Sequence, residues 1–157
     1  WGGVPVCTKA GRIQIGATLR ERGAPFGGET TGHLFFQENY DADSGLIAAL
    51  VAIQALAESG KKLSELINGY RRYVMLPEIM FEVDDADAAL DALRQAFQDG
   101  KQEEIDGLTV EYDYGWFNIR KSNTEPVIKL NVEAETQKSA EALVGRIRSV
   151  LEKKGME

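Results

Sequence analysis

The chain has 157 residues with a hydrophobic fraction of 43%, a charged fraction of 27% and a formal net charge of -7, which is typical of a globular protein of one ordinary domain or two small ones. This acidic balance argues against broad nucleic-acid binding, and no apolar run approaches the roughly 20 residues of a membrane span. The single cysteine, Cys7, excludes an internal disulfide and indicates a reducing, cytoplasmic location.

The first part of the chain, before residue 71, is predicted to be α/β. Its pattern of apolar residues predicts a strand, a short amphipathic helix, a second strand and two further helices, at Val4–Thr8, Ile13–Arg22, Leu34–Phe36, Gly45–Ser59 and Ser64–Tyr70. We expect Ile13 and Leu19 to share one side of the first helix. The helix over 45–59 has the clearest signals, because Ser44 or the aspartate before it can cap its start and Gly60 ends it.

The second part of the chain is predicted to be α+β. Apolar and polar residues alternate over Glu78–Val83, as in a half-buried strand. A helix capped within Asp84–Asp87 follows, with Phe97 inward, and a last helix is capped by Thr136. Between the two helices lie three strands joined by short connections, at Leu108–Tyr112, Trp116–Arg120 and Val127–Val132. The order β-α-β-β-β-α predicts an antiparallel sheet with two helices covering one face.

A glycine-rich segment, Phe26-Gly-Gly-Glu-Thr-Thr-Gly-His33, precedes the strand at 34–36. It combines glycines, a carboxylate, two hydroxyls and the only histidine of the chain. Glycines let the backbone approach a ligand closely, the carboxylate can accept hydrogen bonds from vicinal sugar hydroxyls, and histidine can move protons near neutral pH. The alternative interpretation is a glycine-rich turn with a hydrogen-bonded histidine.

The heptapeptide Arg120-Lys-Ser-Asn-Thr-Glu-Pro126 lies between two of the predicted strands and should form a tight loop at an edge of the sheet. Its guanidinium is a planar bidentate donor, and its hydroxyls, amide and backbone N–H groups add further donors. These donors predict a phosphate site, because an acidic protein must bind phosphate through local groups. An ordinary polar hairpin turn is the alternative, since Ser, Asn and Thr are common turn residues.

Together the two loops resemble those of the alpha-D-phosphohexomutase family, in particular its bacterial phosphomannomutase/phosphoglucomutase branch. Gly28-Glu-Thr-Thr-Gly-His33 is similar to the family's sugar-binding loop, Gly-Glu-x-Ser-Gly-His, with Thr31 in place of the usual serine. The segment 120–126 is similar to its phosphate-binding loop, Arg-x-Ser-(Gly/Asn)-Thr-Glu-Pro. The resemblance extends over nearly the whole chain, with the two loops in the expected order.

The resemblance implies an α/β fold followed by an α+β fold. Residues 1–72 would be the C-terminal part of the family's α/β third domain, and residues 73–157 its TATA-binding-protein-like C-terminal domain. The chain would then be the C-terminal part of a longer enzyme, in keeping with a first residue, Trp1, that is not methionine. We expect the truncated α/β part to self-associate or to be poorly ordered. We also expect a hinge near Arg71–Pro77, because the family's last domain closes over the substrate.

The resemblance also implies a reaction and the residues that serve it. A phosphorylated hexose would be converted between its 1-phosphate and 6-phosphate forms through a phosphoserine and a bisphosphate intermediate. Lys9 and His33 are candidates for assisting proton transfer, and Arg12 stands where the family often has a histidine. The residues expected to bind the substrate are Glu29, Thr31, His33, Arg120, Ser122, Asn123 and Thr124.

The implied cofactors are Mg²⁺ in the full-length enzyme and a hexose 1,6-bisphosphate as activator. The family's Asp-x-Asp-x-Asp metal loop and its phosphoserine loop do not occur here, so we expect no metal site and no turnover by this chain alone. The acidic stretches 41–43 and 84–87 are interpreted as helix caps. Asn123 favours the phosphomannomutase/phosphoglucomutase branch, whereas Thr30 occupies a variable position. Phosphoglucosamine mutase and a stand-alone phosphosugar-binding module are the alternatives.

Overall fold

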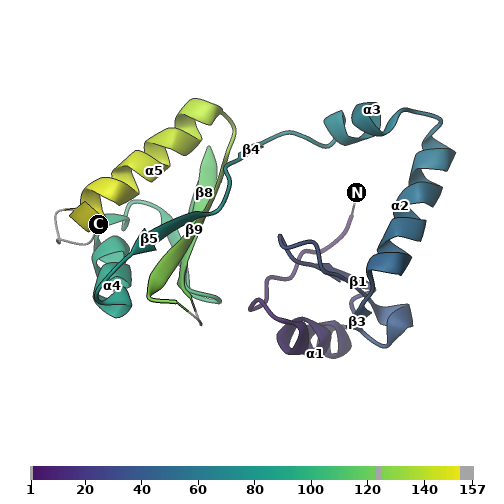
Figure 1. Cartoon of the computed structure of the whole chain (residues 1–157), viewed down its shortest axis with the longest axis horizontal. Coiled ribbons are helices and arrows are strands. Elements are labelled where there is room, and N and C mark those ends of the chain that lie inside the picture. The colour runs from purple at the N-terminus through teal and green to yellow at the C-terminus, as the bar shows by residue number, and fades with distance from the viewer. Residues whose placement is uncertain (1, 123–124, 153–157) are drawn as a thin grey trace. The chain divides into compact units, whose positions relative to one another are not determined.

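The computed structural model describes residues 2–122 and 125–152. The chain forms two compact units, unit 1 (Trp1–Tyr70) and unit 2 (Arg71–Glu157), and each contains both helices and strands (Figure 1). Within the described residues, no helix has the length and apolar character that crossing a membrane requires.

Unit 1 combines a small antiparallel sheet with α-helices. The strands pair in the order β1-β2-β3, with Phe26 opposite Phe36 and Phe35 opposite Asp43. The predicted strand at 34–36 is confirmed. In chain order the elements are α1 (Arg12–Arg22), β1 (Phe26–Gly28), β2 (Leu34–Phe36), the 3₁₀ helix η1 (Gln37–Asn39), β3 (Ala42–Asp43), α2 (Gly45–Ser59) and α3 (Leu63–Asn68).

Two predictions for the start of unit 1 are wrong. Residues 4–8 form no strand. On α1 the predicted inward residue Ile13 is 80% exposed, whereas Ile15 and Leu19 are buried. The reason is a tertiary contact, because the side of α1 that packs against Phe35 of β2 carries Ile15 and Leu19.

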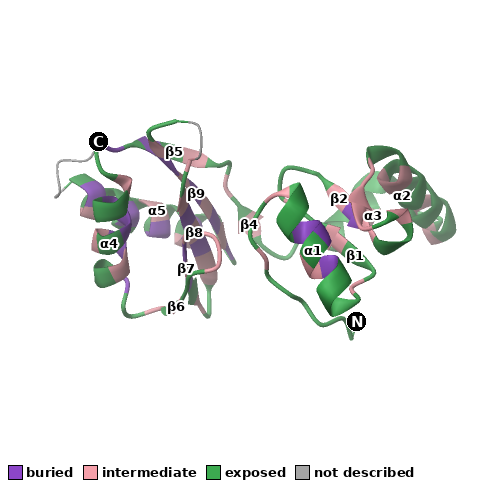
Figure 2. Ribbon diagram, turned by 90° about the horizontal axis from the view of Figure 1, so that it is seen from below, coloured by how far each residue is buried: buried purple, intermediate pink, exposed green. Residues whose placement is uncertain are grey.

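Helix α2 confirms the predicted limits of 45–59, yet its apolar surface is open to solvent. The Ser44 side chain accepts the N–H three residues further on at 3.2 Å, and Gly60, with φ 62°, ends the helix in a left-handed conformation. Leu46, Leu50 and Ile53 are 73%, 59% and 63% exposed, and no residue of α2 is buried (Figure 2). An apolar helix surface of this kind normally packs against another element.

Unit 2 is an antiparallel sheet with α4 and α5 packed against its central strands (Figure 1). The strand order is β4-β9-β8-β7-β6, and β5 also pairs with β9. The predicted order β-α-β-β-β-α is confirmed, with the short strands β4 and β6 added. The elements are β4 (Val74–Met75), β5 (Ile79–Glu82), α4 (Ala86–Ala96), β6 (Lys101–Glu103), β7 (Leu108–Tyr112), β8 (Gly115–Lys121), β9 (Val127–Ala134) and α5 (Gln137–Glu152).

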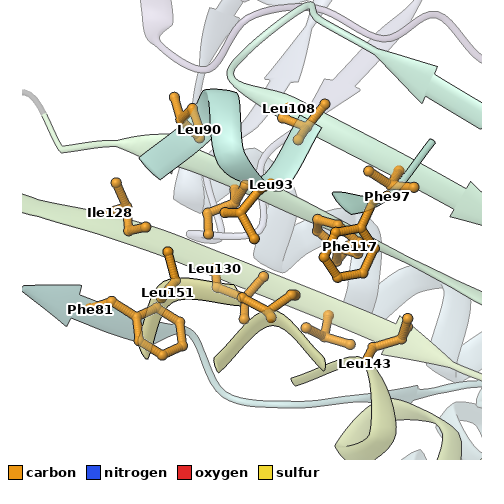
Figure 3. Packing of buried hydrophobic residues seen from close by; sticks show 14 of the residues in the cluster. Phe81, Leu90, Leu93, Phe97, Leu108, Phe117, Ile128, Leu130, Leu143 and Leu151 are labelled. Atoms are coloured by element: carbon orange, nitrogen blue, oxygen red, sulfur yellow. The ribbon is translucent and has the colours of Figure 1, made fainter. Parts of the chain in front are cut away.

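The core of unit 2 lies between the two helices and the sheet (Figure 3). Phe97, directly after α4, and Phe117, on β8, are both fully buried. Their ring centroids are 4.8 Å apart in an edge-to-face arrangement, which is a favourable geometry for aromatic pairs. Leu93 of α4 and Ile147 of α5 are equally buried. These side chains join both helices to the sheet in one continuous apolar cluster.

The other face of the sheet is polar, and we call it the open face. Along β8, Phe117 and Ile119 are buried while Trp116, Asn118 and Arg120 are only half-buried, as expected when side chains alternate between two faces. The same alternation occurs along β9. On these two strands the half-buried residues of the open face are Trp116, Asn118 and Arg120 of β8 and Val127, Lys129, Asn131 and Glu133 of β9.

A hydrogen-bond network ties the turn after α4 to α5. Arg146 of α5 donates from Nη1 and Nη2 to the two carboxylate oxygens of Asp99, at 2.9 and 2.7 Å, and from Nη2 to the Ala96 carbonyl at 3.0 Å. The Tyr112 hydroxyl of β7 donates to Asp99 at 3.1 Å. The hydrogen bonds from Arg146 are the main reason why the pKa of Asp99 falls to about 2. Partial burial raises this pKa, and the hydrogen bond from Tyr112 lowers it further.

This network predicts an acid-sensitive contribution to the stability of unit 2. The folded-state pKa of Asp99 lies below its ordinary value of 3.8, so the contribution is present above that value and is lost as the pH falls toward 2. Asp99→Asn should therefore melt below wild type near neutral pH, and the difference should shrink below about pH 4. Thermal unfolding followed by resonances of unit 2 measures this. Asp113→Asn, in the β7–β8 turn, is the control; a difference for Asp99→Asn that is independent of pH would contradict the prediction.

Candidate functional site

The glycine-rich segment forms the loop between β1 and β2. The Glu29 N–H donates to the His33 carbonyl at 3.0 Å, and the Gly32 N–H donates to the Glu29 carbonyl at 3.0 Å. Gly32 has φ 89°, a left-handed conformation that residues with a Cβ rarely adopt. The loop therefore closes on itself and holds Glu29, Thr31 and His33 on one short piece of backbone.

The Glu29 carboxylate is the centre of this loop. Its Oε1 accepts the Gly11 N–H at 2.8 Å, and its Oε2 accepts the Thr31 hydroxyl at 2.8 Å. The His33 Nδ1 lies 3.0 Å from that hydroxyl and 3.2 Å from Oε2. Since both neighbours of Nδ1 can accept, Nδ1 carries the proton in the neutral imidazole and Nε2 is left as an acceptor. The side chain of Glu29 is 15% exposed and that of His33 58% exposed.

The electrostatics of the loop favour the charged form of Glu29. Burial raises the pKa of this carboxyl, but the Gly11 N–H, the Thr31 hydroxyl and His33 together outweigh burial and leave the pKa below its ordinary value. The carboxylate is thus ionised at neutral pH. A carboxylate has about four lone-pair sites, so the loop retains capacity to accept hydrogen bonds from a ligand.

The residues just before α1 contribute a backbone group to the loop. Gly11 donates its N–H to Glu29 with φ 118°, a conformation that favours glycine. The Lys9 side chain is exposed, and the hydrogen-bond and ion-pair partners of the Glu29 carboxylate among the described residues are Gly11, Thr31 and His33. The structure therefore brings Glu29, Thr31 and His33 together and leaves Lys9 apart from them.

The acidic stretch 41–43 fastens α1 to β3. Asp43 pairs with the Arg12 Nε at 3.1 Å, and Asp41 pairs with the Arg20 Nη1 at 3.4 Å. The prediction that these aspartates cap α2 is wrong, because Ser44 makes the capping hydrogen bond. Arg12, which stands where the family often has a histidine, is engaged in one of these ion pairs.

In unit 2 the second loop joins β8 to β9. Arg120 lies near the end of β8 and its side chain is 27% exposed. The Ser122 N–H donates to the Val127 carbonyl at 2.9 Å, which extends the hairpin pairing beyond the strands. Asn123 and Thr124, the other two residues predicted to bind phosphate, lie outside the described residues.

Two basic side chains lie next to each other at the base of this loop. Arg120 of β8 is directly opposite Lys129 of β9 on the open face. The carboxylate of Glu78, just before β5, reaches both, with its Oε2 3.8 Å from the Arg120 Nη2 and its Oε1 3.7 Å from the Lys129 Nζ. The motif did not reveal Lys129 or Glu78. The available signal was the strand alternation, which places Lys129 on the same face as Arg120 once the hairpin register is known.

A metal does not fit the part of the chain that the structure describes. No group of three or more His, Cys, Asp and Glu side chains that could hold a metal ion occurs among the described residues. The described loop residues instead include the Glu29 carboxylate, the Thr31 hydroxyl and the Arg120 guanidinium, and Lys129 of β9 adds an ammonium opposite Arg120. Such groups suit sugar and phosphate oxygens.

The comparisons with known proteins match the chain to two domain families of one group of enzymes. Residues 1–73 match the family described as "Phosphoglucomutase/phosphomannomutase, alpha/beta/alpha domain III". Residues 78–150 match "Phosphoglucomutase/phosphomannomutase, C-terminal domain".

Individual relatives agree with these matches. A phosphomannomutase of Methanocaldococcus jannaschii is 34% identical over 153 residues, which cover 98% of this chain and 34% of the relative. A probable phosphoglucosamine mutase of Methanopyrus kandleri is 34% identical over 153 residues, covering 90% of this chain and 32% of the relative. A crystal structure of a phosphoglucomutase/phosphomannomutase family protein from Burkholderia thailandensis has a TM-score of 0.84 at 34% identity and covers 99% of this chain and 34% of that one.

The chain thus spans about a third of the length of these relatives. Its two units correspond in order to the two matched domain families. The chain belongs to the phosphoglucomutase/phosphomannomutase family of alpha-D-phosphohexomutases and matches the family's domain III and C-terminal domain.

Proposed function

We propose that the chain provides the sugar-binding and phosphate-binding parts of a phosphohexomutase of the phosphomannomutase/phosphoglucomutase type. Residues 1–72 belong to the third domain in this proposal and residues 73–157 to the C-terminal domain. The complete enzyme would interconvert hexose 1-phosphate and hexose 6-phosphate through a phosphoserine and a bisphosphate. The observation that carries the proposal is the cluster of Glu29, Thr31 and His33, which hold one another within hydrogen-bond distance in the matched third domain.

Glu29 is the residue that we assign to the sugar. Its ionised carboxylate is held in place by the Gly11 N–H and the Thr31 hydroxyl and can accept hydrogen bonds from two adjacent sugar hydroxyls. Such a pair of hydroxyls looks alike after a hexose turns end to end, so one carboxylate would serve both orientations. His33 would assist proton transfer through Nε2, with Lys9 as a second candidate.

Arg120 and Ser122 are assigned to the distal phosphate, together with Asn123 and Thr124. Their guanidinium, hydroxyl and amide donors would hold the phosphate, because phosphoryl transfer depends mainly on positioning and electrostatics. Mg²⁺ and a hexose 1,6-bisphosphate are proposed for the complete enzyme only, since the described residues offer no metal-ligand cluster. The proposal also includes a cytoplasmic location and self-association of unit 1, for which the exposed apolar side chains of α2 provide a surface.

Phosphoglucosamine mutase activity is the second candidate, and the similarity to the probable phosphoglucosamine mutase of Methanopyrus kandleri favours it. The deciding experiment is to assay the full-length enzyme that carries this chain with mannose, glucose and glucosamine phosphates. Preferred turnover of glucosamine phosphate would replace the first proposal. Absence of turnover with all three, while phosphate still binds, would favour a phosphosugar-binding module.

The phosphate assignment predicts a large effect of Arg120→Ala. The substitution removes the bidentate donor, which should cost about 2–3 kcal/mol of phosphate binding. The measurement is a titration of the chain with inorganic phosphate, followed by the NMR shifts of Ser122 and its neighbours. Arg94→Ala is the control, because Arg94 lies on α4 and pairs with Asp91 and Glu104. Unchanged shifts at millimolar phosphate, both in the wild-type chain and in a Glu78→Gln variant that lacks the neighbouring carboxylate, would reject the assignment.

A further inference from the structure

The cluster of Glu78, Arg120 and Lys129 has a charge arrangement that the two loop motifs do not explain. Arg120 and Lys129 are directly opposed across β8 and β9, and the register also places Met80 of β5 opposite Lys129. Glu78 lies just before β5, and its carboxylate reaches both cations on this face of the sheet. Like charges directly opposite each other destabilise a sheet, so this pair of cations needs an anion. Glu78 supplies a negative charge next to both.

Glu78 holds the two cations by charge and not by close hydrogen bonds. Its two oxygens each face one cation, at 3.8 Å for Arg120 and 3.7 Å for Lys129, and both distances exceed the normal hydrogen-bond range. The side chains of Arg120, Lys129 and Glu78 are 27%, 23% and 38% exposed. Ion pairs of this length at a partly solvated surface are weak and can be replaced readily by a better anion.

A phosphate is such an anion. It carries up to two negative charges where a carboxylate carries one, and its oxygens can face a guanidinium and an ammonium at the same time. We infer that Lys129 is a second cation of the phosphate site at the Arg120 loop, and that Glu78 occupies the cations until phosphate displaces its carboxylate. The inference rests on the proposed function, since it assigns two more residues to the same site.

The inference predicts the direction in which each of two substitutions changes the affinity for phosphate. Glu78→Gln keeps the size of the side chain and removes the competing charge, so inorganic phosphate should bind about threefold to tenfold more tightly. Lys129→Met removes the second cation and should weaken binding by a similar factor, whereas Lys129→Arg should retain most of it. Added salt should reduce both differences, because it screens charges at the protein surface.

The experiment is the same NMR titration with inorganic phosphate at fixed ionic strength. Glu133→Gln is the control for Glu78→Gln: Glu133 lies on the open face of the same sheet, about 13 Å along β9 from Lys129, and its replacement changes the net charge equally. Lys101→Met, on β6, is the control for Lys129→Met because Lys101 pairs with Glu111. Both controls should bind phosphate like wild type. Melting temperatures of all variants show that each is folded.

The outcomes separate this inference from the proposed function. Suppose that Arg120→Ala abolishes the phosphate response, but neither Glu78→Gln nor Lys129→Met changes the affinity in the stated direction. That result overturns the inference and leaves the phosphate site intact. An unchanged affinity in either of the two variants also overturns it. Weaker phosphate binding by Glu78→Gln would overturn the competition between Glu78 and phosphate, because Glu78 would then serve to position the two cations. A complete lack of response in wild type and in Glu78→Gln would reject the phosphate site itself.

Discussion

Phe117→Ala is expected to lower the free energy of unfolding of unit 2 by about 3–5 kcal/mol. Phe117 is fully buried at the centre of the sheet, and its ring packs edge-to-face against Phe97. Alanine would lose the apolar contact area and leave a cavity that strands on both sides prevent from collapsing. Unfolding in urea, followed by resonances of unit 2, gives the change in free energy from the transition midpoint.

Met80→Ala is the matched control for this prediction. Met80 is also apolar and lies on the same sheet, but its side chain is 59% exposed on the open face. Its replacement should therefore change the stability of unit 2 by less than about 0.5 kcal/mol. Equal effects of the two substitutions would mean that the cluster beneath α4 and α5 is not what stabilises the unit.

Gly107→Ala is the second substitution with a large expected effect, about 2–4 kcal/mol of destabilisation. Gly107 has φ 77°, and an added Cβ would lie 2.7 Å from the Cβ and 2.8 Å from the Cα of Arg120, and nearer still to the Ile119 carbonyl oxygen. These are atoms of β8 that cannot move without opening its pairing with β7. Because the displaced strand carries Arg120, phosphate binding should weaken together with stability.

Gly145→Ala is the control for the glycine prediction. Gly145 lies within α5, and an added Cβ would meet no atom within 4 Å. Alanine is the better helix former, so this variant should be more stable by about 0.5–1 kcal/mol. A melting curve and a phosphate titration of both variants check the pair. A Gly107→Ala chain as stable as wild type would contradict the steric argument.

The helices and strands of unit 2 could be predicted wherever apolar side chains recur with the spacing of a helix or a strand. Burial alternates over 78–83 and 127–132 because one face of the sheet is buried, and the order of apolar residues indicates that face, although Met80 and Val127 interrupt the pattern. Strand β6, Lys101–Glu103, could not be predicted, since its three residues are all polar or charged. It forms because the backbone of β7 offers a pairing edge and Lys101 meets Glu111 across the strands.

Unit 1 was harder to predict because its local signals compete. Both Ile13 and Ile15 suit an apolar helix face, and the position of Phe35 on another element decides which of them is buried. The aspartates at 41–43 have the composition of a helix cap, yet Asp41 has φ 58° and its carboxylate reaches Arg20 of α1. Such contacts depend on how the chain folds back on itself and leave no local trace in the sequence.

In the candidate site, too, local motifs could be read from the sequence and contacts between distant segments could not. The loop motifs made Glu29 and Arg120 candidates because glycines, hydroxyls and a guanidinium are concentrated within short segments. The groups that hold these side chains come from elsewhere. Gly11 donates to Glu29 across 18 residues, and Glu78 reaches Arg120 from the segment before β5. Neither partner has a distinctive sequence, so only the fold reveals it.

The alternation of β8 also limits how the length of this hairpin can change. Phe117 and Ile119 fill the core while Arg120 lies on the opposite face, so a single residue inserted between Phe117 and Arg120 would move one of the two to the wrong side of the sheet. Two inserted residues would restore the faces but carry Arg120 about 7 Å along the strand, away from Lys129. The alternation ends with β8 at Lys121, and the connection that follows lies outside it. Insertions that preserve both the core and the cation pair are therefore confined to the connection.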